Sequence, residues 1–355
     1  MFRTTTTACL PYRCVMRSRG LQLLLLAAIV VSTPLPAAPQ TGSAKWTTPR
    51  TPWGDPDLQG IWPSSHMVRT PMERDPKLGT RAVLNDEEYA RRMAQVKGYA
   101  NIETLGSEKN VPVSGTTWMD PGTANRQASL VVDPPDGRIP ALTPEAQSRE
   151  SARLARFNTK KDAPDTWEDL STWDRCITLG AVGSMLPFYY NNGVEIVQAP
   201  GYVVIRNEMV HEARVIPLDG RPHAGSAIRT WMGDSRGRWE GTTLVVETTN
   251  FNARVGVGPG DGGVSDPAPR PTGRLRISER FTRTDDETVE YKVTIEDPDT
   301  WTKPWTIAYP LRREANYQFL SEYACHEGNL FVHNVMSAAR AQEQPSNETA
   351  QTKAK

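Results

Sequence analysis

The sequence has no net charge, and the lack of a basic excess excludes one class of protein. Its 355 residues hold 41 lysines and arginines against 41 aspartates and glutamates. A nucleic-acid-binding surface needs an excess of basic side chains, which this balance does not supply. The sequence also has no P-loop, no strand–Gly-x-Gly-x-x-Gly–helix unit and no His-Glu-x-x-His motif. We therefore expect no nucleic-acid partner and no cofactor.

Long apolar runs are also missing, apart from Leu21 to Val31. Arginines precede this run and small residues follow it, which is the order of a secretion signal. The alternative is a retained anchor, but the run is shorter than the ~20 residues that a membrane-spanning helix needs. We expect residues 1–40 to be a signal peptide. The mature protein is then periplasmic or secreted, with no membrane attachment.

Cysteine is scarce, with four residues in the chain. Cys9 and Cys14 leave with the signal, so Cys176 and Cys325 remain. Two cysteines in an oxidising compartment most simply form a disulfide. The competing interpretations are a free buried Cys325 and a thiolate nucleophile beside His326.

Proline, glycine and tryptophan are plentiful, at 29, 26 and 10 residues. This composition is typical of short strands with ordered loops rather than of helix bundles. Residues 46–190 are expected to wrap the rest of the chain with a hairpin at 129–140 and two short helices. One helix starts at Asn85, which forms a capping box with Glu88, and the other starts at Thr143–Pro144.

From Val194 onward the pattern changes to short β-strands separated by glycine and aspartate. Residues 191–338 are predicted to form an antiparallel, lipocalin-like β-barrel, so the fold class is mainly β with an irregular N-terminal wrap. Residues 339–355 are expected to be a disordered tail. The predicted strands lie near 194–198, 202–217, 228–232, 244–249, 275–282, 289–296, 305–311 and 319–325.

The predicted strand 202–217 places polar side chains on an apolar face. Alternation from Val203 to Val215 turns Asn207 and His211 the same way as their apolar neighbours. Burying an amide and an imidazole costs free energy unless partners meet them. These two groups therefore indicate a lined cavity. The opposite face carries Arg206, Glu208, Glu212 and Arg214, expected to be exposed unless a one-residue register shift exchanges the two faces.

The same alternation turns Glu279 and Tyr291 inward. A histidine beside a carboxylate in a pocket can act as a general base, so we expect His211 to be the acid/base and Glu279 to orient it. The competing interpretation is a structural hydrogen bond from His211 to Glu279 that satisfies both groups in the core. The predicted substrate-binding residues are Asn207, Tyr291, His223 and His326.

Two other patterns favour structural interpretations. The spacing of His211 and His223 matches no zinc motif, so we expect no metal site. The run Gly233–Gly241 contains Gly-Asp-Ser-Arg-Gly, which fits a nucleophile elbow by letter. That elbow needs a strand before it and a helix after it, whereas a strand-forming run follows here. We interpret the run as a hairpin turn.

Several motifs give the chain a resemblance to a known group. They are TPWGDPDLQGIW at 51–62, VVDPPDGRIP at 131–140, the run 233–241 and YACHEGN at 323–329. With them, residues 46–340 resemble an abundant family of secreted proteins from soil and marine bacteria, which implies export but no particular activity. The C-terminal half also resembles lipocalin-like barrels through Trp239-x-Gly241 and a Thr-Leu strand, although Thr242 stands where members carry Asp.

These features predict an exported protein that binds a small organic molecule in a barrel cavity. The expected chemistry is His/Glu acid–base catalysis of the lyase, isomerase or hydrolase type. The alternative functions are a non-catalytic carrier of an apolar or aromatic ligand, and a structural envelope protein without a ligand.

Overall fold

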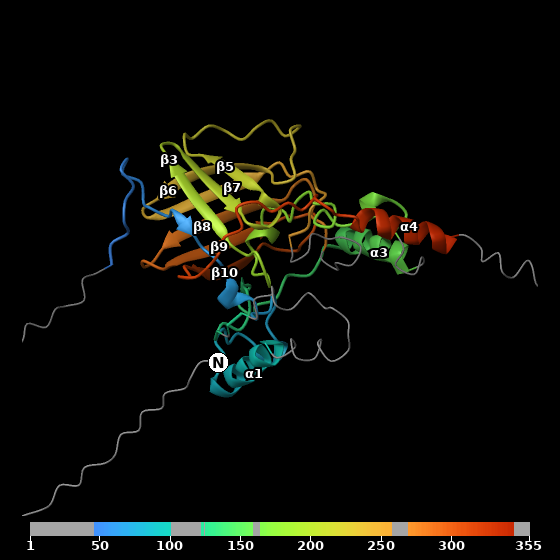
Figure 1. Ribbon diagram of the computed structural model, residues 1–355, viewed down its shortest axis with the longest axis horizontal. Coiled ribbons are helices and arrows are strands. Elements are labelled where there is room, and N and C mark those ends of the chain that lie inside the picture. Colours follow the sequence, from blue (N-terminus) through green and yellow to red (C-terminus); the bar gives the residue numbers. More distant parts are fainter. Residues whose placement is uncertain (1–45, 101–121, 124, 159–163, 258–268, 344–355) are drawn as a thin grey trace, which may run out of the picture. The chain divides into compact units, whose positions relative to one another are not determined.

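Two antiparallel β-sheets form the centre of the fold in the computed structural model (Figure 1). The smaller sheet has the strand order β1-β3-β4-β5, and the larger sheet has the order β2-β10-β9-β8-β7-β6. The structure describes residues 46–100, 122–123, 125–158, 164–257 and 269–343, so the predicted signal at 1–40 lies outside it. The strands are β1 (Gly60–Ile61), β2 (Val131–Asp133), β3 (Val194–Ala199), β4 (Tyr202–Asn207), β5 (Ala213–Pro217), β6 (Asp234–Glu240), β7 (Thr243–Thr249), β8 (Arg276–Arg283), β9 (Thr288–Glu296) and β10 (Trp305–Arg312).

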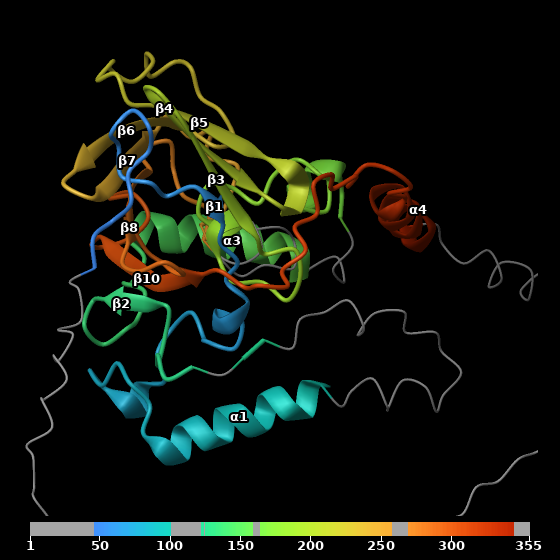
Figure 2. The ribbon, with the colours of Figure 1, turned by 60° about the vertical axis from the view of Figure 1, so that its left-hand side comes forward.

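The antiparallel, mainly β class is confirmed, whereas a closed barrel is not detected. Within the described ranges no hydrogen-bonded ladder joins the two sheets. Strands β5 and β6 nevertheless lie next to each other. Gly237 permits this approach, because a Cβ there would lie 2.8 Å from a methyl carbon of Ile216. The N-terminal segment adds β1 to one sheet and β2 to the other; Figure 2 shows β2 beside β10.

Apolar side chains fill the space between the sheets. Val203, Ile205 and Ile216 from the smaller sheet and Phe281 and Val293 from the larger one belong to a single cluster and are 0% exposed. Burying each such side chain contributes about 1.5–3 kcal/mol. The interior predicted to hold a ligand is therefore mainly a packed core.

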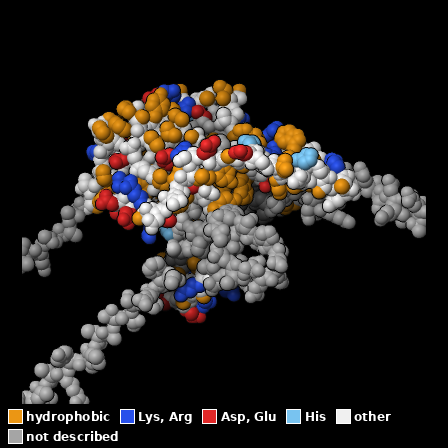
Figure 3. Space-filling model, viewed as in Figure 1, with side chains coloured by type: hydrophobic (Ala, Val, Ile, Leu, Met, Phe, Trp, Pro, Cys, Tyr) orange, Lys and Arg blue, Asp and Glu red, His pale blue; other side chains and the backbone are white. Residues whose placement is uncertain are grey.

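The opposite, outer face of the smaller sheet stays partly apolar. Val197, Tyr202 and Val215 point outward there and are 37–60% exposed. Hydrophobic side chains gather over β3 and β5 in the space-filling view (Figure 3).

Both predicted N-terminal helices are present. Helix α1 (Asp86–Ala100) starts with the predicted capping box: the Glu88 amide donates to Asn85 Oδ1, and the Asn85 amide donates to Glu88 Oε2, each at 2.9 Å. Helix α3 (Pro144–Asn158) is capped by Thr143, whose Oγ1 accepts from the Ala146 amide at 3.1 Å. The 3-10 turns are 65–67, 76–78, 167–169, 183–185 and 209–211.

A third helix, α4 (Phe331–Glu343), is absent from the prediction. It occupies the end of the predicted barrel and the first residues of the predicted tail, and residues 344–355 lie outside the described part. Arg340 holds it by donating to the carbonyl oxygens of Pro164 and Asp165, at 2.9 and 3.1 Å.

Several strand predictions are wrong. The run 233–241 forms β6 rather than a turn, and it pairs with β7 over its whole length. Residues 319–325 are irregular, and 228–232 hold only an isolated bridge at Thr230. The hairpin at 129–140 keeps its turn, with Gly137 at φ +67°, but its one strand, β2, pairs with β10.

The predicted strand 202–217 is interrupted. Strand β4 ends at Asn207, a 3-10 turn at Met209–His211 contains Val210 at φ +61°, and β5 then begins at Ala213. The turn shifts the alternation by one residue. As a result Arg214 is buried and Val215 is 60% exposed, the reverse of the prediction.

The predicted disulfide is present between Cys176 and Cys325, 149 residues apart. It fixes the irregular segment before α4 to the loop that precedes β3. Every helix among the described residues is too short or too polar to cross a lipid bilayer.

Candidate functional site

The outer face of the larger sheet carries rows of polar side chains on adjacent strands. The ladders pair Asp234 with Thr249, and Arg276 with Glu296. The next row runs through Arg236, Glu247, Ser278 and Thr294. Alternation explains the rows, because every second residue of β7, β8 and β9 packs in the core and the residues between them point outward.

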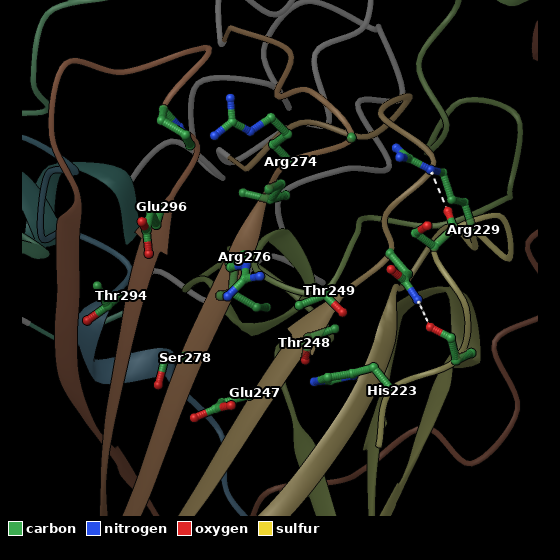
Figure 4. Close-up of a pocket in the computed structure, with 17 residues that line it drawn as sticks. His223, Arg229, Glu247, Thr248, Thr249, Arg274, Arg276, Ser278, Thr294 and Glu296 are labelled. Atoms are coloured by element: carbon green, nitrogen blue, oxygen red, sulfur yellow. Dashed lines mark hydrogen bonds between the residues drawn. The ribbon is translucent and has the colours of Figure 1, made fainter. Parts of the chain in front are cut away.

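A hollow of about 730 Å³ lies over these rows. Its floor is the outer face of β7, β8 and β9, and its walls come from the loop after β5 and the segment before β8 (Figure 4). Thr249, Arg276 and Glu296 belong to the floor, while His223 and Arg229 belong to the first wall. The site therefore joins segments that are far apart in the sequence.

His223 and Asp234 form a hydrogen-bonded pair at this hollow. Nδ1 of His223 lies 3.1 Å from Oδ2 of Asp234, and the two side chains are 29% and 20% exposed. The same oxygen accepts from the Ala224 amide at 2.8 Å, and Arg236 donates to Oδ1 at 2.5 Å. The imidazole extends into the hollow in Figure 4.

The charge on Asp234 decides which ring nitrogen carries the proton. Partial burial opposes ionisation, but the Ala224 amide, Arg236 and His223 outweigh it, and the pKa of Asp234 is lowered. The ionised carboxylate accepts a hydrogen bond, so Nδ1 of neutral His223 carries the proton. Nε2 then keeps its lone pair and can take a proton from a molecule in the hollow.

Arginines supply the remaining charge of the hollow. Arg274 pairs with Asp299 at 2.9 Å, and Glu247 is paired with Arg238 at 2.8 Å. Arg276 and Arg229 form no ion pair with the described residues. The hollow thus combines a histidine–aspartate pair with two guanidinium groups that lack a carboxylate partner.

Glu279 and Tyr291 lie together in the core, as the alternation predicts, but the carboxylate is occupied by Arg214. Arg214 donates to Glu279 from Nη1 at 2.5 Å and from Nη2 at 2.9 Å, and Tyr291 donates its hydroxyl at 3.0 Å. Burial, followed by the nearby carboxylate, raises the pKa of Tyr291, so its hydroxyl keeps its proton. Arg214 and Glu279 are 2% and 0% exposed. The group that orients Glu279 is therefore an arginine, and the buried network runs through Arg214 and Tyr291.

Asn207 is buried on the apolar face as predicted, at 2% exposure. Neither side-chain atom of its amide has a hydrogen-bond partner among the described residues. It lies at the end of β4, beside the 3-10 turn.

The remaining predicted site residues lie in turns. The backbone of His211 ends the 3-10 turn 209–211, and its side chain lies outside the description. His326 is exposed in the turn that follows the disulfide. It is not part of the hollow wall that holds His223.

The sequence prediction missed most of the hollow. Arg276, Glu247 and Glu296 are absent from the prediction because they point outward, whereas the predicted site consists of polar groups on inward faces. Asp234 is absent because the run 233–241 is interpreted as a turn. A usable signal was present, because Arg276, Ser278, Thr294 and Glu296 alternate with core residues on two predicted neighbouring strands. The pairing of His223 with Asp234 depends on how the loop after β5 folds, which local patterns do not fix.

His, Cys, Asp and Glu side chains in the described part of the chain form no group of three or more arranged to hold a metal ion. In comparisons with known proteins, the chain matches no family model, no curated protein and no solved structure.

Proposed function

We propose that this protein binds a small polar organic molecule in the hollow over β7, β8 and β9, and that His223 transfers a proton to or from it. The observation that carries the proposal is the hydrogen bond between His223 Nδ1 and Asp234 Oδ2, at the wall of a hollow of about 730 Å³. A carboxylate that fixes the ring and its tautomer is the usual support of a catalytic histidine.

The proposed chemistry is general acid–base catalysis. Nε2 of His223 accepts a proton from the bound molecule, the imidazolium is stabilised by Asp234, and the proton returns to the product. The arginines nearby stabilise negative charge that develops on the molecule. This sequence of steps suits an elimination, an isomerisation or a hydrolysis in which His223 activates water.

A carrier of an apolar ligand has less support. Thr249, Arg276, Ser278 and Glu296 make the floor of the hollow polar. An apolar ligand would desolvate these groups without replacing their hydrogen bonds. The lipocalin-like closure of the two sheets stays a proposal, supported by the closeness of β5 and β6.

We also propose that the protein works outside the cytoplasm. Its support is the disulfide between Cys176 and Cys325, a bond that persists in oxidising compartments. The signal-like order of residues 1–40 supports the same conclusion.

The test follows the consumption of small molecules from the medium in which the producing cells grow. Wild type and His223→Gln are incubated with an extract that holds the small molecules of this medium, and mass spectrometry compares the compounds before and after. We expect wild type to convert at least one compound and His223→Gln to convert it at least about a hundredfold more slowly. His326→Gln, which removes an exposed histidine outside the hollow, is the matched control and should behave as wild type.

Equal conversion by His223→Gln and wild type would show that His223 is not the acid/base. If wild type converts nothing but retains a compound through gel filtration, the carrier alternative gains and the catalytic proposal fails.

A further inference from the structure

We propose that the molecule bound in the hollow carries a carboxylate group, held between Arg276 and Arg229. This inference rests on the proposed function and names its substrate class: a small organic acid with one negative charge.

Among the described residues, no carboxylate pairs with Arg276, the arginine of β8 on the floor of the hollow. Its neighbours along the chain are neutralised, Arg274 by Asp299 at 2.9 Å and Arg280 by Glu240 at 2.8 Å. The side chain of Arg276 makes no ion pair or hydrogen bond with the described residues, although Glu296 lies opposite it in the ladder. Its guanidinium group is therefore free to bind an anion from the floor of the hollow.

Arg229 faces the same space from another wall. Its Nε donates to the Ser226 carbonyl oxygen at 3.2 Å, which fixes the start of the guanidinium group. Its Nη1 lies over Gly273, where a Cβ would come within 1.5 Å of it. Figure 4 shows Arg276 rising from β8 and Arg229 entering from the loop after β5. Glycine at 273 thus leaves room for the second cation.

The charge of the hollow favours a monoanion. Asp299 neutralises Arg274, and Arg238 neutralises Glu247. The two guanidinium groups of Arg229 and Arg276 therefore stand against the carboxylate of Glu296, which leaves one positive charge. A carboxylate balances this charge and fits the planar guanidinium group with two parallel hydrogen bonds. The two negative charges of a dianionic phosphate would exceed this single positive charge.

The same geometry places the carboxylate near the proton-transfer group. Asp234 is on β6 and Arg276 is on β8, with Thr249 of β7 between them. Two strand spacings amount to ~10 Å, so a molecule of only a few carbon atoms can reach both Arg276 and His223.

The test titrates three probes, acetate, inorganic phosphate and glycerol, into wild type, Arg276→Gln and Arg280→Gln. Arg280 is the matched control because it lies on the same strand and face, changes the charge equally and is not part of the hollow. NMR follows the arginine Nε–Hε signals and the His223 ring signals. We expect acetate to shift the Arg276 and His223 signals of wild type in a saturable way. Arg276→Gln should weaken acetate binding about tenfold, and Arg280→Gln by less than about twofold.

Gly273→Ala tests Arg229 without a change of charge. The new methyl group displaces the guanidinium group, so acetate should bind several-fold more weakly. An unchanged acetate affinity in this variant would remove Arg229 from the site.

Other outcomes separate this inference from the proposed function. Equal acetate binding by wild type and Arg276→Gln, or tighter binding of phosphate than of acetate, would overturn the carboxylate assignment. If glycerol shifts the His223 signals and acetate does not, the assignment fails while the proposed function stands. If acetate binds at Arg276 but His223→Gln converts the compound of the extract as fast as wild type, the proposed function fails and the carboxylate site stands.

Discussion

At the scale of single residues, the chemistry of the hollow depends on which nitrogen of His223 carries the proton. In Asp234→Asn the amide can donate to Nδ1 and stabilise the opposite tautomer, which places the proton on Nε2. Diethyl pyrocarbonate acylates imidazole nitrogens that hold a free lone pair. We expect the reagent to acylate His223 at least about tenfold more slowly in the variant than in wild type. Peptide mass spectrometry measures the rate, with His326 as the internal reference; an unchanged rate would contradict the role of Asp234.

The buried pair of Arg214 and Glu279 leads to a prediction about stability. Glu279→Leu leaves a guanidinium group uncompensated in the core and should reduce the free energy of unfolding by about 3–5 kcal/mol. The double variant Arg214→Met/Glu279→Leu removes both charges and should recover most of this loss. Urea unfolding measures both variants. Arg238→Gln, which opens an exposed pair, should change stability by less than about 1 kcal/mol. A double variant no more stable than Glu279→Leu would refute the explanation.

His66 couples the fold to pH. Burial, and then the neighbouring Arg312, lower its pKa from 6.5 to about 4. The unfolded chain therefore takes up a proton first as the pH falls, so stability decreases between pH 6.5 and 4 and this contribution levels off below 4. The loss is at most roughly 3 kcal/mol. His66→Phe should flatten this part of the urea-derived stability profile between pH 7 and 4, and an unchanged slope would exclude His66 as its source.

At the scale of elements, the carboxylate of Glu208 holds the segment after β10 against the start of β3. It accepts hydrogen bonds from the backbone amides of Leu320 at 2.7 Å and Gly193 at 3.1 Å. It also accepts from the Tyr317 hydroxyl at 2.5 Å and from the side-chain amide of Asn191 at 2.9 Å. Glu208→Ala removes all four acceptor contacts. We expect hydrogen exchange of the Leu320 amide to accelerate strongly and stability to fall by about 3 kcal/mol. Glu240→Ala, which breaks exposed ion pairs with Arg238 and Arg280 on the larger sheet, is the control and should leave Leu320 protected.

Glu208 also marks where sequence alternation stops being a guide. The pattern placed Val203, Ile205 and Asn207 inward correctly, because they share one regular strand. The turn at Met209–His211 then shifts the inward–outward alternation by one residue. The charged residue Arg214 therefore faces the core in place of Val215. Local sequence patterns do not predict this shift, because it depends on Val210 at φ +61°, and valine rarely adopts that conformation.

Strand β6 shows a second limit of local reasoning. Its residues Asp234 to Glu240 include two arginines, a glycine and a serine, and have little intrinsic preference for a strand. They form one because the neighbouring β7 offers a full ladder of hydrogen bonds. Because β6 is absent from the prediction, Asp234, which is the partner of His223, is absent from it too. The reverse error is the strand expected at 319–325, because its apolar residues lie in an irregular segment where Leu320 is 44% exposed.

At the scale of the whole molecule, the sequence predicts the mainly β class correctly but does not predict whether the two sheets close into a barrel. Alternating runs were sufficient for the antiparallel strands β3, β7, β8, β9 and β10. Whether sheets close into a barrel depends on contacts between distant edges, and here β5 and β6 approach without a ladder. Because the interior is a packed core, the candidate site lies on the outer face of the larger sheet and not in the expected barrel interior. The disulfide was predictable because only two cysteines follow the signal.

The disulfide should make a large contribution to stability, comparable with that of the buried Arg214–Glu279 pair. Linking Cys176 to Cys325 closes 149 residues of the unfolded chain, and the entropy of such a loop corresponds to ~5 kcal/mol. The Cys176→Ser/Cys325→Ser variant should therefore lose about 3–5 kcal/mol in urea unfolding. Wild type in a reducing agent should match the variant, because both lack the same constraint. If the reduced protein unfolds at the same urea concentration as the oxidised one, the bond does not stabilise the fold.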